Sequence, residues 1–400
     1  MRIFWLPFLL ALCLNIAIDF FIYKQMKKSN LHATHILSRL HVVLAVAAHT
    51  AMLVTLLLPL SGNGTMVNAM KVIWCYAMFY FPKFLWALIY AVALPHFWPK
   101  WLKRALSVAA LSIALLVMGI MWQGFRTTPY SIQKSDVTIG SPHLPAAFDG
   151  YRICHISDLH LGTYGNDTAF VAACVDSINA LHPDLIVFTG DLVSRTTSEA
   201  IPFKSILCRL KARDGVLSIL GNHDYDDYTN MTAAQRKQDH ESLCRLQKEC
   251  SWTLLNNTTS TLHRDGDSII VVGTENYSVK HTPDYSRLDS TISTIDCKRN
   301  FTILLQHNPQ MWRNRVLKND YAIDLTLSGH THAMQMMVTM CGKRFSPAQW
   351  VYDEWGGLYT QGQRHLYVNI GLGMVGIPAR IGSAKPEITL LTLKCSTTPR

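Results

Sequence analysis

The stretch that decides the fold is residues 154–162, Cys-His-Ile-Ser-Asp-Leu-His-Leu-Gly. It begins as an apolar run typical of a buried strand, and it ends in an acid and an imidazole, Asp158 and His160, two positions apart. One strand that stops on such side chains is unremarkable, because loops often carry them. The rest of the chain decides whether these two belong to a larger site.

Four more apolar runs end in the same way, in side chains that bind metals. The five runs, each with the residues that follow it, are Tyr151–Ser157 with Asp158 and His160, Leu185–Thr189 with Asp191, Val216–Leu220 with Asn222, His223 and Asp224, Phe301–Gln306 with His307, and Leu325–Ser328 with His330 and His332. Their Ile, Leu and Val content predicts strands buried on both faces. Helix-like stretches at 167–180 and 198–210 alternate with the first three runs, which predicts an α/β domain. Ligands gather at the carboxyl ends of such strands, so we expect one shared site.

The residue types indicate the chemistry of this site. Asp, Asn and His offer oxygen and imidazole nitrogen without thiolate, which suits Mn, Fe or Zn better than copper or an iron–sulfur cluster. Seven ligand-capable groups are too many for one ion and predict two. Gly190, Gly221 and Gly329 stand beside the ligands, where we expect them to let the chain turn sharply.

In this order the motifs resemble those of the calcineurin-like metallophosphoesterases. The family pattern is Asp-x-His, Gly-Asp, Gly-Asn-His-Asp/Glu, a single His and Gly-His-x-His, and each element is present within about residues 150–395. Residues 368–378 (VNIGLGMVGIP) and 386–390 (PEITL) are similar to a membrane-associated bacterial branch. That branch includes YkuE-like and YaeI-like phosphoesterases and UDP-2,3-diacylglucosamine pyrophosphatases. Ala333 departs from it, because the branch usually has Gly after the last His.

The resemblance implies roles for individual residues and a fold. The first ion would be held by Asp158, His160, Asp191 and His332, and the second by Asp191, Asn222, His307 and His330. His223 would face the substrate, oriented by Asp224. The implied fold is a four-layer αββα β-sandwich flanked by helices. Two ions, most simply Mn with Fe or Zn as alternatives, would share a hydroxide that attacks phosphorus.

The first third of the chain is of another kind. The protein has 400 residues, is 49% hydrophobic and has a mean hydropathy of +0.13, with the apolar residues concentrated before residue 126. Crossing a membrane takes about 20 apolar residues as a helix. Four segments meet that requirement: Ile3–Tyr23, Leu40–Leu60, Val72–Leu94 and Ala105–Trp122. We therefore expect a four-helix transmembrane region at 1–125, a connector and edge strand at 126–149, and the phosphoesterase domain at 150–400.

Positive charge predicts how the helices are oriented. The first and third loops carry Lys24, Lys27, Lys28, Arg39, Lys100, Lys103 and Arg104, and the second has only Lys71 at its edge. Because Lys and Arg stay on the cytoplasmic side, the domain after residue 126 is expected on the outer side, the periplasm if the membrane is a bacterial inner membrane. The net charge of +10 does not indicate nucleic-acid binding, since no Lys/Arg run with interleaved aromatics follows residue 150.

Charged residues and cysteines allow a few further predictions. Asp19 and Lys83 lie within predicted spans, where we expect them to pair with each other or to reach toward a helix end. His35 and His49 lie about four helical turns apart, but packed histidines are far more common than haem ligands. If the domain is exported, disulfides are open to Cys244, Cys250, Cys297 and Cys341, with no connectivity readable from the sequence.

The substrate is less clearly indicated than the chemistry. Residues 349–359 (QWVYDEWGGLY) are aromatic, and Trp350, Tyr352 and Trp355 would either line an apolar substrate entry or pack beneath the loop. With the membrane region, they favour a lipid-linked or cell-envelope phosphoester, mono- or diester. A UDP-2,3-diacylglucosamine pyrophosphatase-type hydrolase is the alternative if the orientation is reversed. A non-catalytic scaffold or metal sensor is disfavoured because every position of the pattern is kept. The oligomeric state is left open.

Overall fold

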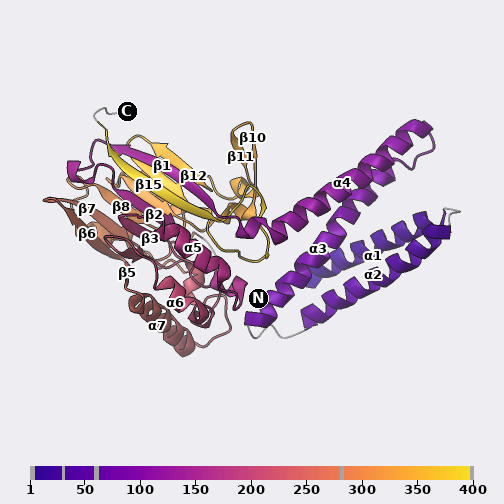
Figure 1. The fold of residues 1–400 in the computed structure, drawn as a ribbon, viewed down its shortest axis with the longest axis horizontal. Coiled ribbons are helices and arrows are strands. Elements are labelled where there is room, and N and C mark those ends of the chain that lie inside the picture. The colour runs from indigo at the N-terminus through magenta and orange to yellow at the C-terminus, as the bar shows by residue number, and fades with distance from the viewer. Residues whose placement is uncertain (1–4, 29–31, 58–62, 280–282, 397–400) are drawn as a thin grey trace. The chain divides into compact units, whose positions relative to one another are not determined.

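The computed structural model describes residues 5–28, 32–57, 63–279 and 283–396. It consists of two compact units that divide after Arg126, and each is described by itself (Figure 1). The ends of two predicted spans, at residues 3–4 and 58–60, lie outside the described part.

The first unit contains four long apolar helices, as predicted. They are α1 (Trp5–Lys27), α2 (His32–Leu57), α3 (Asn63–Val92) and α4 (Lys100–Arg126). Each is long and apolar enough to cross a membrane. All four helices run past the predicted spans at one end or both, because polar residues such as Lys27 extend the hydrogen-bonded helix beyond its apolar part.

A polar cluster lies inside this unit and confirms the predicted pairing of Asp19 with Lys83. Lys83 Nζ is 2.9 Å from Asp19 Oδ1. The other carboxylate oxygen accepts a hydrogen bond of 2.7 Å from Tyr80 and lies 3.1 Å from His49 Nε2. His49 is therefore engaged within the unit by a carboxylate and a tyrosine.

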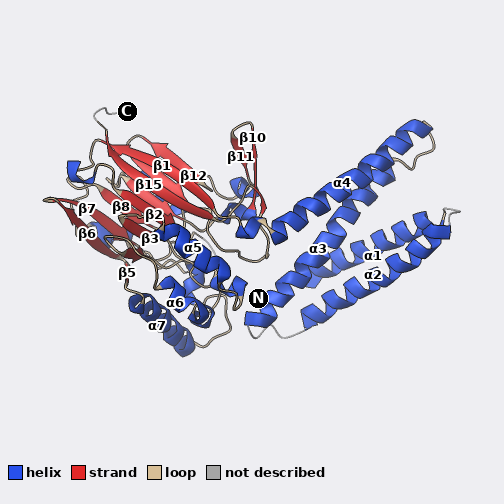
Figure 2. Cartoon of the chain, in the orientation of Figure 1, coloured by secondary structure: helices blue, strands red, loops and turns tan. Residues whose placement is uncertain are grey.

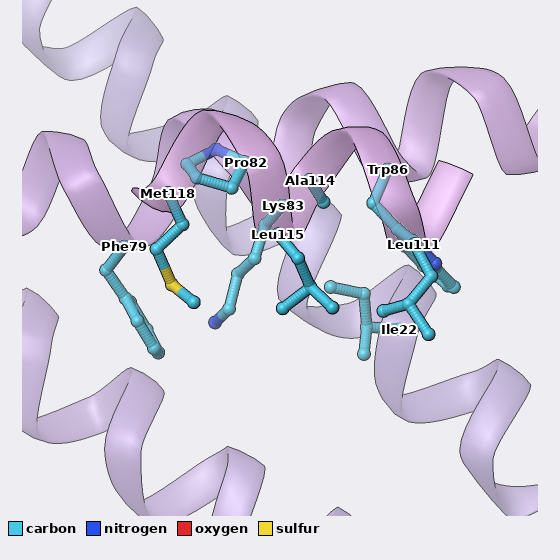
Figure 3. Close-up of a pocket in the computed structure, with 9 residues that line it drawn as sticks. All are labelled: Ile22, Phe79, Pro82, Lys83, Trp86, Leu111, Ala114, Leu115 and Met118. Carbon is cyan, nitrogen blue, oxygen red and sulfur yellow. The ribbon is translucent and has the colours of Figure 1, made fainter. Parts of the chain in front are cut away.

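A cavity of about 290 Å³ lies between α1, α3 and α4, and Figure 3 shows the side chains around it. They are Ile22, Phe79, Pro82, Lys83, Trp86, Leu111, Ala114, Leu115 and Met118. Lys83 is the one charged side chain among them, and its Nζ lies 3.6 Å from the centre of the Phe79 ring. Its pairing with Asp19 neutralises the charge beside this apolar cavity.

The second unit is built on two six-stranded mixed sheets (Figure 2). In spatial order the first sheet has β1 (Gln133–Ser141), β15 (Glu387–Cys395), β2 (Arg152–Ile156), β3 (Leu185–Phe188), β4 (Val216–Ser218) and β5 (Trp252–Leu254). The second has β12 (Gly357–Gln361), β13 (Arg364–Val368), β9 (Leu325–Ser328), β8 (Thr302–Leu305), β7 (Asp267–Gly273) and β6 (Thr258–Arg264). Four strands of the first sheet, β2, β3, β4 and β5, run parallel to one another. Four strands of the second sheet, β13, β9, β8 and β7, do the same.

Alternate side chains of the central strands serve two different cores. Ile153, Leu185 and Val187 point between the sheets, where they meet Ile303, Leu305 and other side chains of the second sheet. Their neighbours along the first sheet point the other way, onto α5 (Ala169–Asn179), α6 (Lys204–Leu207) and α7 (Ala233–Glu249). The second sheet is covered on its outer face by α8 (Leu288–Ile292) and the turn of helix Trp312–Leu317. The fold is the expected four-layer sandwich.

Two expectations about the second unit are corrected. The stretch 198–210 is not one helix but short turns at Thr197–Glu199 and Ile201–Phe203 followed by α6, because Pro202 cannot donate the hydrogen bond that a continuous helix needs. The disulfide joins Cys250 to Cys208, which was not among the candidates, whereas Cys244, Cys297 and Cys341 are free thiols.

A small third sheet follows the last histidine motif. It contains β11 (Lys343–Phe345), β10 (Met336–Met340) and β14 (Ile381–Gly382), with β10 in the middle. β10 and β11 form a hairpin, which Figure 1 shows standing out from the sandwich of the second unit.

Candidate metal centre

The carboxyl ends of five strands bring their polar side chains to one place, although the strands belong to two sheets. β2, β3 and β4 carry Asp158, Asp191 and Asn222 from the first sheet, and β8 and β9 carry His307 and His330 from the second. The sequence predicted this meeting point at the strand ends, and the expected sandwich supplies it from the strands of both sheets.

The first ligand group consists of Asp158, His160 and His332, all buried. His332 Nε2 lies 3.2 Å from Asp158 Oδ1 and 3.1 Å from His160 Nε2. Asp191 Oδ2 lies 3.4 Å from His160 Nε2 and completes the four side chains expected around the first ion.

The second group gathers around His307. Its Nε2 lies 3.2 Å from Asp191 Oδ2, 3.1 Å from Asn222 Oδ1 and 3.2 Å from His330 Nδ1. Asp191 therefore touches members of both groups, as a bridging carboxylate must. Asp158 also approaches His307 and Asp191 closely enough to share an ion with them.

These spacings fit side chains that share a metal ion. Ligand atoms bonded at about 2.0–2.2 Å to one ion lie about 3.0–3.6 Å from each other. The contacts above, between 3.1 and 3.4 Å, fall within that range. The donor set is hard oxygen and imidazole nitrogen, which suits divalent Mn, Fe or Zn.

Two buried carboxylates give the pocket a negative charge that a bound cation can balance. Burial opposes ionisation of Asp158, but His332 and His307 outweigh it and hold the pKa of that carboxyl below its usual range. The pKa of Asp191 is likewise held well below its usual value, against its burial, by His307 and His223. Two buried carboxylates thus stay ionised. Despite its burial, the charge of Asp191 raises the pKa of His307 to about 9, so this imidazole must release a proton when it binds a metal.

The imidazoles of His160 and His330 stay neutral and keep a lone pair for a metal. Burial lowers the pKa of His160 to about 4. Burial, followed by the charge of His307, lowers the pKa of His330 to about 3. His307 Nδ1 donates to the carbonyl of Thr189 at 2.7 Å, which directs its Nε2 to the pocket.

The backbone at the ligands is held in an unusual conformation. Asp158, His160, Asp191, His330 and His332 all have positive φ, between 43° and 76°. Non-glycine residues rarely occupy this region, and such strain concentrates at functional sites. The surrounding structure therefore holds these residues in a backbone conformation that they would not favour by themselves, and this conformation directs their side chains into the site.

The three neighbouring glycines serve two different purposes. Gly190 has a φ of +96°, so it does make the sharp turn that was expected. Gly221 and Gly329 are required for space instead: a Cβ on Gly221 would overlap Asp191 Oδ1, and one on Gly329 would overlap Asp158 Oδ2. Both ligand carboxylates pack directly against backbone.

The structure corrects the expected partner of Asp224. Its carboxylate accepts backbone hydrogen bonds from Asp191 at 2.8 Å and Gly221 at 2.9 Å through Oδ2, and from Leu192 at 2.9 Å and Val193 at 3.2 Å through Oδ1. Asp224 thus fastens the loop after β3 to the loop after β4.

His223 is oriented by other groups. Its Nδ1 donates to the carbonyl oxygen of Ser194 at 2.8 Å, and its ring stacks on Tyr228 at 4.3 Å between centroids. Tyr228 in turn accepts a hydrogen bond of 2.9 Å from Asn222 Nδ2. Sequence reasoning missed Ser194 and Tyr228, since neither belongs to a motif.

Arg380 is a second residue that no motif indicated. Its fully buried guanidinium donates to the carbonyls of residues 370, 371, 373 and 384. One of its nitrogens, Nη2, lies 3.5 Å from His332 Nδ1. Arg380 thereby ties the loop after β13 to a metal-ligand candidate.

The three aromatic residues flagged as substrate-entry candidates have separate positions. The Tyr352 hydroxyl lies 3.1 Å from His330 Nε2, at the metal centre. Trp355 is buried in a small apolar cluster with Ala333 and Met337. Trp350 is largely exposed to solvent. Trp355 therefore packs beneath the loop, whereas substrate entry past Tyr352 and Trp350 stays a prediction.

Comparison with known proteins places this site in a family. The model of the calcineurin-like phosphoesterase family matches residues 151–334. The metallophosphoesterase YkuE of Bacillus subtilis is 36% identical over 274 residues, which cover 66% of this chain and 87% of that protein. The chain belongs to the calcineurin-like phosphoesterase family.

Two other relatives of this calcineurin-like phosphoesterase add context. The UDP-2,3-diacylglucosamine pyrophosphatase LpxG of Chlamydia trachomatis is 28% identical over 318 residues, covering 65% of this chain and 89% of that protein. A zebrafish (Danio rerio) transmembrane protein with a metallophosphoesterase domain is 32% identical over 275 residues, covering 65% of this chain and 56% of that protein. The protein is thus a metal-dependent hydrolase of phosphoesters that carries candidate membrane helices.

Proposed function

We propose that this protein is a dinuclear metallophosphoesterase that hydrolyses a lipid-linked or cell-envelope phosphoester. The observation that carries the proposal is the convergence of seven metal-binding side chains at 3.1–3.4 Å, with Asp191 between the two groups. Two divalent ions held there, which we expect to be Mn, would activate a shared water and neutralise the phosphoryl oxygens.

The protein's own residues divide the remaining work. Asp158, His160 and His332 would hold one ion, Asn222, His307 and His330 the other, and Asp191 would join them. The Thr189 carbonyl fixes the His307 ring through Nδ1, and Tyr352 contacts the far nitrogen of His330. Six of the seven ligand side chains are buried, all but His330, so bulk water screens their charges little.

His223 is the candidate proton donor. Because a carbonyl can only accept, Nδ1 must carry a hydrogen that it donates to Ser194, which leaves Nε2 to gain or lose a proton. The ring is only half-buried, as is that of His330, and can face a substrate. An imidazole so placed can protonate the departing oxygen of a phosphoester near neutral pH.

The membrane helices and one relative support a lipid-linked substrate. Four candidate spans precede the phosphoesterase unit in the same chain, and the name of the chlamydial relative specifies a diacylglucosamine compound. The Lys/Arg count supports a location of the phosphoesterase unit on the outer side of a bacterial inner membrane. A UDP-2,3-diacylglucosamine pyrophosphatase activity is the second candidate and requires the opposite orientation.

The test is metal-dependent turnover by the full chain purified in detergent. We expect hydrolysis of bis(p-nitrophenyl) phosphate or p-nitrophenyl phosphate with Mn, loss with a chelator, and recovery when Mn is added back. Asp191→Asn should abolish both turnover and binding of a second ion, as counted by metal analysis. His223→Ala should lower turnover about 100-fold or more while both ions stay bound.

The matched control is His263→Ala, which removes an exposed histidine on the edge strand β6. It should leave metal content and turnover unchanged. Two bound ions without turnover on either compound or on vesicle-embedded phospholipid would favour the scaffold or sensor alternative.

A further inference from the structure

The β10–β11 hairpin presents an apolar face to the outside. Side chains alternate along a strand, so Met336, Val338 and Met340 of β10 share one face. Directly paired residues share a face too, which adds Phe345 opposite Val338 and Lys343 opposite Met340. We call these five side chains the hairpin face.

The hairpin face is exposed where a soluble hairpin would be polar. Its apolar members are 38% (Met336), 54% (Val338), 61% (Met340) and 44% (Phe345) exposed. Sheets with one wet side normally place polar residues there. Contiguous exposed apolar side chains mark an interaction surface, and flexible Met side chains suit a partner without fixed shape.

The opposite face of the hairpin is attached to the metal centre. Met337 packs in the small apolar cluster with Ala333 and Trp355, and Ala333 follows the ligand candidate His332 directly. Ser346, just after β11, donates a 2.6 Å hydrogen bond to the carbonyl of Ala333. The hairpin is therefore held firmly beside the ligand loop.

The chemistry of the hairpin face fits the interfacial layer of a bilayer. Met, Val and Phe match acyl chains, and Lys343 at the turn matches anionic headgroups. Trp350, 80% exposed and five residues beyond Phe345, is a residue type favoured at that interface. The chain also tethers this unit to the candidate membrane helices by a short connector. Only residues 127–132 separate α4 from β1, which is at most about 20 Å of extended chain.

We propose that the hairpin face inserts into the interfacial layer of an anionic bilayer and brings lipid phosphoesters to the metal centre. This inference rests on the proposed function and assigns the hairpin as the element that selects membrane-bound substrate. The partner of the hairpin face is thus the lipid layer. A second copy of the chain packed on the same face is the alternative that the test must exclude.

The first arm of the test measures where the hairpin turn lies. Cys341, exposed at the turn, is left as the one exposed thiol by replacing Cys13, Cys75 and Cys395 with Ser, and is labelled with the fluorophore NBD. The full chain is placed in phosphatidylcholine–phosphatidylglycerol vesicles with doxyl-labelled lipids. We expect a blue-shifted emission that shallow doxyl groups quench.

A matched label reports on a part of the same unit far from the hairpin. Asp265→Cys, with Cys341→Ser, puts the fluorophore at the exposed β6–β7 turn, which Figure 1 shows at the other end of the second unit. This label should emit as in water and escape quenching. Equal, water-like emission at both positions would overturn the inference, as would energy transfer between differently labelled copies that accounts for the shift at Cys341.

The second arm compares two substrates. Val338→Asp and Met340→Asp should lower the ratio of turnover on a vesicle-embedded phospholipid to turnover on bis(p-nitrophenyl) phosphate by about tenfold or more. Thr339→Asp places the same charge on the opposite face of β10 and should leave the ratio unchanged. An unchanged ratio in all three variants refutes the inference, whereas absent turnover of both the soluble compound and the vesicle-embedded phospholipid by the unaltered protein refutes the proposed function instead.

Discussion

Replacing Asp224 by Asn is expected to destabilise the loop that carries Asp191 while leaving His223 correctly oriented. Asn keeps one oxygen acceptor and turns the other into an NH₂ group. Whichever way the amide is placed, two backbone N–H groups of the four that now meet Asp224 lose their acceptor and face a donor. His223 keeps its own hydrogen bond to the Ser194 carbonyl.

The magnitude follows from the two lost bonds. A hydrogen bond to a charged acceptor contributes about 1.5–3 kcal/mol, so the free energy of unfolding should fall by about 3–6 kcal/mol. For a unit of this size that corresponds to a decrease in Tm on the order of 10 °C. Burial and the charge of Asp191 raise the pKa of Asp224 to about 7, so the comparison is best made near pH 8, where the carboxylate is ionised.

The assay is thermal unfolding of the full chain in detergent, followed by near-UV circular dichroism with metal and with chelator. Asp265→Asn makes the same chemical change at an exposed turn and should shift the free energy of unfolding by less than about 0.5 kcal/mol. If Asp224→Asn unfolds at the wild-type temperature but moves the pH profile of turnover, the carboxylate acts on His223 and the hydrogen-bond argument is wrong.

Three further predictions follow from single contacts. Tyr352→Phe removes the hydroxyl beside His330 and should weaken metal binding about 10-fold, measured by metal titration; unchanged affinity would exclude a role in orienting that ligand. Burial lowers the pKa of His155 to about 3, so its neutral form supports the fold above pH 6.5 and stability is lost as pH falls below that value. Urea unfolding of His155→Gln should therefore show a slope against pH that is shallower by about 1.4 kcal/mol per unit between pH 6 and 4. Cys208→Ser removes a disulfide between residues 42 positions apart and should lower the free energy of unfolding by about 4 kcal/mol in protein purified without reductant; an unchanged value would mean that this bond does not form.

Much of the fold could be predicted because its determinants are local. Each ligand candidate follows an apolar run of four to seven residues, and both features are visible in one short stretch such as 154–162. The membrane helices need only length and hydropathy. The pairing of Asp19 with Lys83 could be expected because two buried charges in an apolar layer have few other partners.

Other contacts could not be predicted from such stretches. Asp224 stands next to His223 in the chain yet bonds to backbone some 30 residues earlier, at Asp191–Val193. Arg380 is one of many arginines until the fold surrounds it with carbonyl oxygens. Cys250 had several possible partners, and the packing of α6 beside α7 selected Cys208.

The sequence by itself determined the kind of site, its metal-binding side chains and the presence of membrane helices, since these depend on residue type and short spacing. Only the tertiary structure decided which strands of each sheet deliver the ligands, that Gly221 and Gly329 give room for carboxylates, and that one face of the β10–β11 hairpin is left apolar and exposed. The physical reason is that exposure and hydrogen-bond partners are properties of the packed chain. They depend on segments that lie far apart in sequence and meet only when the sandwich closes.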